Sequence, residues 1–523
     1  MKKIVLSVAV VLAILAAAKW STADNRDAAP AIKITVDADV VLRNEFPAEL
    51  FSFNVNHYAF EKDFLAADGS IAAEVTDQLT VFDHSMYRYP GGLVANRFHW
   101  ETAVGPEPRE PQKKVAHESA TPVRFGVNEY FEFVEVVGGK PWYVLNLVGW
   151  HDSEMIHELS AEEMAASNAR LAKLRVEQAI DAAPRYYQLG NELDRAEYQW
   201  SNEKYIQRAR LTMDAIKKVD PEARFVAFLR DFDWVYKGDE RRGTKSLFKD
   251  FIPAILQGLP EVNDFSLHFY YDDPGNSRKI KSIERRIVQF RRAIDIATEA
   301  RGGQPANVWI TEHARGVDLP RGRAMDRADL TGNLSGAVST ADFLIAMSQM
   351  PEVQGAFLHG LNAGPWQVFD ASIRDRDLRP RPVYWGMRIL HDVRFDLTLA
   401  TATEQTKVFG DYLGGYDVRA SGFSNADRSE FGLWAVNRAL AAVDAQLQVG
   451  KLAGQTVQVE QQYMSLPAGK DIEARFLDPQ LQVEPVQSCV TFAADGTATL
   501  SLPAGSVSAY RFTPASSGQC AGE

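Results

Sequence analysis

The sequence predicts a (β/α)8 TIM barrel followed by a C-terminal all-β sandwich domain. Over residues 46–395, eight short apolar runs alternate with amphipathic helical segments, the pattern of parallel strands joined by helical crossovers. Over residues 396–523 the pattern changes to short alternating runs broken by Gly, Asn and Pro, which is typical of an all-β domain. The count of eight strands favours a closed barrel over an open, doubly wound sheet. An open sheet would also carry a Gly-rich nucleotide loop after its first strand, and "FSFNVNHYAF" has none.

The predicted barrel strands share an apolar body and a polar end. They are residues 50–56, 86–92, 142–149, 186–192, 224–230, 265–271, 308–313 and 355–362. Helical periodicity between them is clearest in residues 202–220, where apolar side chains recur at spacings of 3, 4 and 3. Residues 282–300 are a second example.

The N-terminus has the three parts of a secretory signal peptide, predicted over residues 1–23. Lys2 and Lys3 form a basic start, residues 4–18 an apolar stretch, and residues 21–23 a small-residue cleavage site. The apolar stretch is shorter than the about 20 residues that a membrane-spanning helix usually needs. We therefore expect cleavage, export to the periplasm or the medium, and no stable membrane insertion of the mature chain.

Two further features concern the second domain. Residues 24–45 are predicted to hold a polar linker and a strand that joins the β-sandwich. Cys489 and Cys520 are the two cysteines of the chain. In an oxidising compartment they could form a disulfide that pins the last strands, and two unpaired thiols are the alternative.

Charge and composition exclude several classes of partner. The formal net charge is −12 and no basic run occurs, which argues against nucleic acid or an anionic membrane. No cluster of Cys and His residues suggests a metal site, and we expect no metal and no cofactor. The oligomeric state stays open.

The polar residues at the strand ends form the candidate site, because catalytic residues of such barrels come from the C-terminal ends of the strands. Glu192 and Glu312 are the predicted catalytic residues. The predicted substrate-binding residues lie at the same ends or in the loops that follow: Asn54, Arg88, Trp150, Asn191, His268, Tyr270, Asn362 and Trp366. Motifs for a serine nucleophile elbow, a phosphate loop or an H-E-x-x-H zinc site are absent from the sequence.

Two carboxylates that face each other across a cavity suit the cleavage of a glycosidic bond, in which one donates a proton and the other attacks the anomeric carbon. Arg88 beside Glu312 would keep that nucleophile ionised, and a hydrogen bond from Tyr270 would act in the same direction. The amide of Asn191 can hold a sugar 2-hydroxyl. The alternative for Glu192 is a carboxylate at a helix N-terminus.

The other candidates have structural alternatives of their own. Arg88 could brace the barrel floor or neutralise a buried acid, and His268 could support the site without touching the ligand. Trp150 and Trp366 could stack on sugar rings or be packing residues.

Five segments in the same order resemble the retaining glycoside hydrolases of clan A, most closely the α-L-arabinofuranosidase type of family 51. They are "YRYPGG" with "NRFHWETAVGP", "RFGVNEYFEFVEVVGGKPWYVLNLVG", "LGNELD", "SLHFYY" and "WITEHARG". The resemblance spans residues 46–400. It implies that Glu192 is the acid/base, Glu312 the nucleophile, Asn191 the 2-hydroxyl partner and Tyr270 a hydrogen-bond donor to the nucleophile. An exported glycosidase that degrades polysaccharide or oligosaccharide by double displacement is therefore expected.

Three regions depart from the arabinofuranosidase pattern. Leu93 stands where an asparagine follows P-G-G, and His313 replaces a tryptophan. The strand-one region, which usually carries a substrate-binding acid, has Asn54, Asn56 and His57 instead. We expect these positions to line the glycone pocket. The β-glucuronidases of the heparanase type and the β-xylosidases of the same clan are therefore alternatives. Arg315 could bind a uronate carboxylate or pair with an acid of the barrel.

Other classes of protein are also possible. A non-catalytic carbohydrate-binding protein would keep the barrel without turnover. A polysaccharide lyase would use a Tyr or His base, and a metal-dependent hydrolase would need a ligand cluster that the sequence does not show. The sugar, the linkage and endo or exo action stay open.

Overall fold

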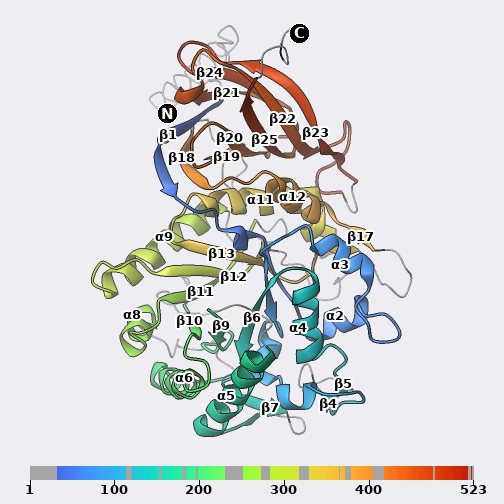
Figure 1. The fold of residues 1–523 in the computed structure, drawn as a ribbon, viewed down its shortest axis with the longest axis vertical. Coiled ribbons are helices and arrows are strands. Elements are labelled where there is room, and N and C mark those ends of the chain that lie inside the picture. Colours follow the sequence, from blue (N-terminus) through green and yellow to red (C-terminus); the bar gives the residue numbers. More distant parts are fainter. Residues whose placement is uncertain are drawn as a thin grey trace, which may run out of the picture.

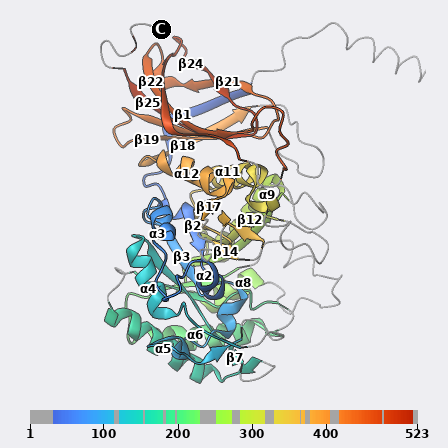
Figure 2. The same cartoon turned by 90° about the vertical axis from the view of Figure 1, so that its right-hand side faces the viewer.

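A computed structural model describes most of the chain (Figure 1). The described residues are 32–113, 120–151, 156–178, 184–195, 198–229, 251–272, 283–316, 329–363, 365–370, 378–404, 417–474, 478–515 and 520. The predicted signal peptide lies outside them. The predicted fold class is confirmed: a closed barrel of parallel strands surrounded by helices lies beside a largely antiparallel β domain (Figures 1 and 2).

The barrel closes in the order β10-β11-β12-β13-β2-β3-β6-β9, and every neighbouring pair is parallel. Each strand overlaps one of the eight predicted runs. The strands are β2 (Ser52–Asn54), β3 (Met86–Tyr89), β6 (Lys140–Leu145), β9 (Tyr186–Leu189), β10 (Arg224–Phe228), β11 (Asp264–Tyr271), β12 (Asn307–Arg315) and β13 (Val353–Leu358).

The lower interior of the barrel is filled by large side chains that point inward from the strands. Trp142, Trp309 and Phe357 pack together there with Met86 and Val226, and ring centroids within this cluster lie 5.0 Å apart for Trp142 and Trp309. Such layers make the interior of a TIM barrel a packed core rather than a pore. The site above this layer therefore stands on a rigid floor.

Amphipathic helices surround the strands, as the periodicity predicts. Those that the structure describes are α2 (His57–Asp63), α3 (Ala73–Leu79), α4 (Val127–Val136), α5 (Ala161–Gln178), α6 (Asn202–Lys217), α8 (Phe251–Gly258), α9 (Ile283–Ala300), α11 (Leu334–Ser348) and α12 (Pro382–Asp392). None of the helices in the described residues is long and apolar enough to cross a membrane.

The β domain is one continuous sheet of nine strands in the order β23-β22-β25-β20-β19-β18-β1-β21-β24. Its strands are β1 (Ile32–Arg43), β18 (Leu397–Glu404), β19 (Val418–Ser424), β20 (Phe431–Asn437), β21 (Val443–Val449), β22 (Thr456–Ser465), β23 (Gln480–Thr491), β24 (Thr497–Leu502) and β25 (Ser506–Pro514). Strand β1, from the beginning of the described chain, pairs antiparallel with β18 and parallel with β21. Ile34, Val457 and Leu502, from distant parts of this sheet, share one core, so the sheet folds over on itself.

Helices α11 and α12 lie between the barrel and the β domain (Figures 1 and 2). Trp434 and Val507 of the β domain belong to the same hydrophobic core as Ala337 and Met387 of these helices. Helix α11 is buried on nearly all sides, as expected for a helix covered by a barrel on one face and a sheet on the other. The two domains therefore share a core.

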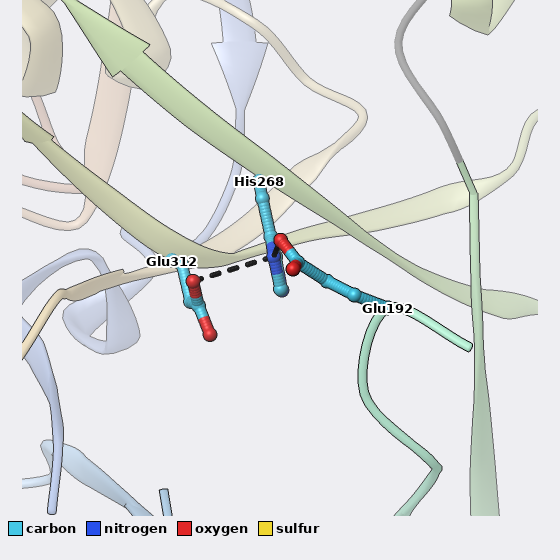
Figure 3. Close-up of side chains that lie close together, drawn as sticks. All are labelled: Glu192, His268 and Glu312. Carbon is cyan, nitrogen blue, oxygen red and sulfur yellow. Dashed lines mark hydrogen bonds and ion pairs between the residues drawn. The ribbon is translucent and has the colours of Figure 1, made fainter. Parts of the chain in front are cut away.

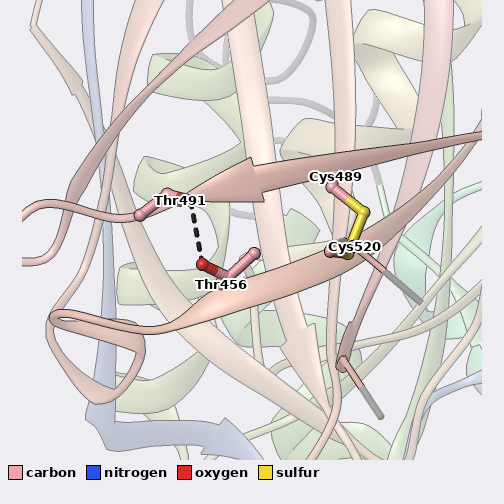
Figure 4. Close-up of a disulfide and its surroundings, with 4 residues drawn as sticks. All are labelled: Thr456, Cys489, Thr491 and Cys520. Atoms are coloured by element: carbon pink, nitrogen blue, oxygen red, sulfur yellow. Dashed lines mark hydrogen bonds between the residues drawn. A yellow bond between two sulfur atoms is a disulfide. The ribbon is translucent and has the colours of Figure 1, made fainter. Parts of the chain in front are cut away.

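Cys489 of β23 is joined to Cys520 by a disulfide with the two Cα atoms 5.8 Å apart (Figure 4). The same edge of the sheet carries a hydrogen bond of 2.9 Å between the hydroxyls of Thr456 and Thr491. Both features tie the edge strand β23 to its surroundings.

Candidate active site

The carboxyl ends of the barrel strands bring Glu192, His268 and Glu312 together (Figure 3). One oxygen of each carboxylate and one ring nitrogen of His268 all lie within 4.8 Å of one another. Inverting glycosidases separate their carboxyl groups by about 6.5–9.5 Å, whereas retaining ones keep them about 5–5.5 Å apart. The two glutamates are therefore close enough to act on one glycosidic bond, one at the anomeric carbon and the other at the leaving oxygen.

Glu312 lies in a pocket of hydrogen-bond donors and is 4% exposed. The Tyr270 hydroxyl donates to its Oε2 at 2.7 Å, and Arg88 Nη1 donates to its Oε1 at 3.1 Å. The Nδ1 atoms of His268 and His359 lie 3.4 Å and 3.2 Å from Oε2. These neighbours come from β3, β11 and the end of β13, so the fold rather than the local sequence assembles the pocket.

The electrostatics of this pocket favour an ionised nucleophile. Burial alone would raise the pKa of the Glu312 carboxyl, but the imidazoles of His268 and His359 and the guanidinium of Arg88 outweigh it and hold the pKa well below its ordinary value. Burial raises the pKa of the Tyr270 phenol well above its ordinary value, with Glu312 acting in the same direction. Tyr270 therefore stays protonated and remains a donor.

Glu192 lies in the turn after β9, and its carboxylate points into the mouth of the barrel. Its backbone has a φ of +46° and follows Gly190 with a φ of +78°. Its Oε1 lies 2.9 Å from His268 Nδ1, and its Oε2 accepts a hydrogen bond of 2.9 Å from Arg195 Nη1. The following helix α6 is capped by Ser201, not by Glu192. Glu192 therefore faces the site instead of serving as a helix cap.

Arg88 is the centre of a buried hydrogen-bond network beneath the two glutamates and is 0% exposed. Besides Glu312, its guanidinium donates to Gln188 Oε1 at 2.8 Å, Asn54 Oδ1 at 2.5 Å and Asn191 Oδ1 at 2.5 Å. The planar fork of an arginine fixes the directions of all these bonds at once. Arg88 thus orients both the nucleophile and the neighbour of Glu192.

Asn54 lies inside the barrel and does not face its mouth. It is 0% exposed, and besides accepting from Arg88 it donates from Nδ2 to the Thr311 carbonyl at 2.9 Å. Both ends of its amide are therefore engaged by the protein. The structure places Asn54 as a support for Arg88, whereas the sequence suggested a contact with substrate.

Asn191 has a spare donor directed at open space. Its Oδ1 is held by Arg88, while its Nδ2 is buried and has no hydrogen-bond partner within the described residues. A Cβ atom added at Gly92 would lie 4.0 Å from that Nδ2 and 3.0 Å from Glu312 Oε1. Gly92 therefore places no side chain between amide and nucleophile, and such a buried, unpartnered donor is a candidate to bind a substrate hydroxyl.

Asn96 fixes the backbone of Asn191 and was not predicted from the sequence. It accepts from the Asn191 amide at 3.0 Å and donates to the Asn191 carbonyl at 2.6 Å. It lies in the short helix η2 (Leu93–Arg97) directly after the P-G-G turn. That turn was the available signal, because a loop that follows strand two must pass over the mouth of the barrel.

Aromatic side chains form one wall of the site. Trp366, in the hairpin strand β15 (Trp366–Gln367), lies with its ring centroid 4.5 Å from that of His359 and 5.1 Å from that of Tyr270. Asn362, in the paired strand β14 (Asn362–Ala363), donates to Asp63 and is 9% exposed. The structure therefore places Trp366 against His359 and Tyr270, two neighbours of the nucleophile, and engages the amide of Asn362 with a carboxylate.

Trp150 lies in a separate hairpin, β7 (Gly149–His151), and is half-buried. Its ring stacks on that of His99, with centroids 3.8 Å apart and planes 2° from parallel. His99 follows the η2 segment that carries Asn96. Trp150 is therefore associated with the loop beside Asn191.

One expectation about the nucleophile strand is corrected. His313 does not line the glycone pocket, because its side chain is 0% exposed and stacks on Phe343 on the opposite face of β12. Of the two alternatives for Arg315, a uronate or an acid of the protein, the structure shows an acid, but it is Glu473 of the β domain and not a barrel residue, at 2.6 Å and 2.9 Å. The sequence could not reveal that partner, since 158 positions separate the two residues.

Glu192, His268 and Glu312 are also residue types that ligate metals. However, Arg195 and Arg88 already neutralise the two carboxylates at 2.9 Å and 3.1 Å. Two cations so close to the ligand atoms disfavour a further cation. This geometry suits acid–base chemistry better than metal binding.

Glu192 thus follows the fourth strand of the closed barrel, and Glu312 lies in the seventh. A model of the "Alpha-L-arabinofuranosidase 1 domain" matches residues 78–281. This match confirms the resemblance to the family 51 α-L-arabinofuranosidases.

Curated proteins agree with that match. A probable α-L-arabinofuranosidase C of Aspergillus niger is 24% identical over 301 residues, 54% of this chain and 57% of that protein. An intracellular exo-α-(1→5)-L-arabinofuranosidase of Streptomyces lividans is 27% identical over 223 residues, 41% of this chain and 32% of that protein. The chain thus spans about half the length of the Aspergillus relative and less of the other.

Solved structures show the same fold at low identity. A family 51 α-L-arabinofuranosidase of Thermotoga petrophila covers 92% of this chain and 100% of its own, with a TM-score of 0.71 and 16% identity. A family 44 xyloglucanase of Paenibacillus polymyxa covers 93% of this chain and 100% of its own, with a TM-score of 0.59 and 13% identity.

Proposed function

We propose that the chain is a retaining α-L-arabinofuranosidase that cleaves arabinose-containing polysaccharides or oligosaccharides by double displacement. The observation that carries the proposal is the close approach of the Glu192 and Glu312 carboxylates, within 4.8 Å, with Glu312 kept ionised by its neighbours. The match to the arabinofuranosidase domain over residues 78–281 supports α-L-arabinofuranose as the glycone. Arg315 is paired with Glu473, so the side chain that could have bound the carboxylate of a uronate is already engaged.

In the first step Glu312 attacks the anomeric carbon while Glu192 gives its proton to the leaving oxygen. The bond from Tyr270 and the contact with Arg88 hold the attacking carboxylate in place. The free Nδ2 of Asn191 donates to the sugar 2-hydroxyl, a contact that strengthens as positive charge develops on the ring.

In the second step Glu192, now ionised, removes a proton from water, and the water displaces Glu312 from the sugar. Glu192 can serve both steps because it is half-buried at the rim, whereas Glu312 is buried. His268 Nδ1 lies 2.9 Å from a Glu192 oxygen and 3.4 Å from a Glu312 oxygen, so it helps to hold the two carboxylates at a fixed separation in both steps.

Hydrolysis of a panel of nitrophenyl glycosides tests this function. The panel holds the α-L-arabinofuranoside, β-D-xyloside, β-D-glucuronide, β-D-galactoside and β-D-glucoside, each run beside Glu312→Gln. We expect release from the arabinofuranoside alone, its loss in the variant, and initial formation of a product with retained configuration by NMR. Release from another member only, or an inverted product, would overturn the proposal.

The N-terminal sequence supports export, and we include it in the proposal. Residues 1–23 would be removed and the enzyme would act on substrate outside the cytoplasm. Cell fractionation with N-terminal sequencing tests this. A chain found in the cytoplasm with Met1 retained would contradict it.

A further inference from the structure

His359, at the end of the eighth predicted strand, occupies the wall of the site beside the nucleophile. It directly follows β13, and its backbone amide donates to the His313 carbonyl at 2.9 Å. This bond attaches the base of the side chain to the nucleophile strand. The position of the imidazole is therefore set by the barrel and not by a flexible loop.

One edge of the imidazole faces the nucleophile and the open space next to it. Nδ1 is buried and lies 3.2 Å from Glu312 Oε2. Cε1 lies 3.9 Å from the point where a Cβ at Gly92 would stand. That same point is 4.0 Å from Asn191 Nδ2, so His359 and Asn191 bound the same space on two sides of Glu312.

The far nitrogen of the ring is available. His359 Nε2 makes no hydrogen bond to any residue in the part of the chain that the structure describes, and the side chain is 14% exposed. Trp366 packs edge-on against the ring at 4.5 Å and limits its rotation. A ring nitrogen of histidine donates or accepts a hydrogen bond according to its protonation, so Nε2 can bind a hydroxyl in either role.

We propose that His359 determines glycone specificity: Nε2 forms a hydrogen bond with a hydroxyl of the bound sugar other than the 2-hydroxyl, while Nδ1–H donates to Glu312. The contact at Nδ1 is short but not aligned as a hydrogen bond without substrate. Such bonds often tighten only in the complex. This inference rests on the proposed function, because it assigns a role toward that enzyme's glycone.

Two isosteric variants separate the two nitrogens. His359→Asn keeps an amide nitrogen near the place of Nδ1 and removes the group at Nε2. His359→Gln keeps a polar group near the place of Nε2 and removes the donor at Nδ1. The exposed His84→Asn serves as the control, since its imidazole lies on the surface beside Asp83.

The assay compares kcat/KM for the nitrophenyl α-L-arabinofuranoside and its 3-deoxy and 5-deoxy analogues. We expect the wild type to prefer the parent over one analogue by about tenfold or more, the value of a lost hydrogen bond in a buried site. His359→Asn should lose this preference, because kcat/KM for the parent falls to about the value for the analogue. His359→Gln should keep the preference and lose kcat.

Discrimination by His359→Asn equal to that of the wild type would overturn the inference, as would equal losses in both variants. Calorimetric binding of the free sugars, run in parallel, reads the same preference without turnover. If the wild type cleaves a different glycoside of the panel, the proposed function has failed. The variants are then compared on deoxy analogues of that sugar, so the two failures remain distinct.

Discussion

Removing one hydroxyl group from Tyr270 tests how the nucleophile is held. The phenol donates to Glu312 Oε2 at 2.7 Å, and a hydrogen bond to a charged group contributes about 1.5–3 kcal/mol. Since each 1.36 kcal/mol is a factor of ten in rate, Tyr270→Phe should lower kcat/KM by about 10- to 150-fold. The ring remains in place, so no cavity is made.

The same change predicts a shift in the pH profile. A carboxylate that loses a donor becomes easier to protonate, so the acid limb assigned to Glu312 moves to higher pH. The upper bound is about one to two pH units, because one unit corresponds to 1.36 kcal/mol. The measurement is kcat/KM for the nitrophenyl arabinofuranoside across the pH range.

The adjacent tyrosine gives a matched control. The Tyr271 hydroxyl contacts His313 and Thr340 on the other face of β11 and does not touch Glu312. Tyr271→Phe should therefore leave the acid limb in place. If Tyr270→Phe retains kcat/KM within threefold of the wild type, or if both variants shift the limb equally, the assigned support of the nucleophile is wrong.

Three further changes probe the surroundings. Arg195→Gln removes a cation 2.9 Å from Glu192, so the alkaline limb of kcat/KM should move up by about half a unit; an unmoved limb would count against it. Gly92→Ala places a methyl 3.0 Å from Glu312 Oε1, so kcat/KM should fall about tenfold or more while the melting temperature changes little. Burial alone would raise the pKa of the Glu473 carboxyl, but the guanidinium of Arg315 outweighs burial, so the pKa lies below its ordinary value. The ion pair therefore contributes its full stability above the unfolded-state pKa of about 4.3 and loses it as pH falls through the lower folded-state pKa. Calorimetry should show Glu473→Gln less stable than the wild type at pH 7, with the difference vanishing at low pH; a constant difference would contradict it.

The sequence predicted the barrel because the evidence for it is local. Strand-like and helical patterns alternate along the chain, and their number alone indicates closure. The ends of those strands also pointed to Glu192 and Glu312, since a parallel barrel gathers all its carboxyl ends at one mouth. These inferences need only periodicity and chain order.

The roles of the supporting residues depend on contacts that no local pattern reveals. Asn54 was expected to meet substrate, but it supports Arg88 from inside the barrel. Asn96 and His359 reach Asn191 and Glu312 from segments that follow other strands, β3 and β13. The partner of Arg315 comes from another domain. Side-chain direction and distant pairing decide these roles, and both follow from tertiary packing.

Trapping the glycosyl-enzyme tests the central claim most directly. Glu192→Ala lacks the base for the second step, so with a dinitrophenyl α-L-arabinofuranoside, whose leaving group needs no acid, the intermediate should accumulate. Mass spectrometry of the digested protein should find one arabinosyl group on the peptide that holds Glu312, and Glu192→Ala combined with Glu312→Gln should carry none. A label on another residue, or turnover without any covalent intermediate, would contradict the assignment of Glu312 as nucleophile.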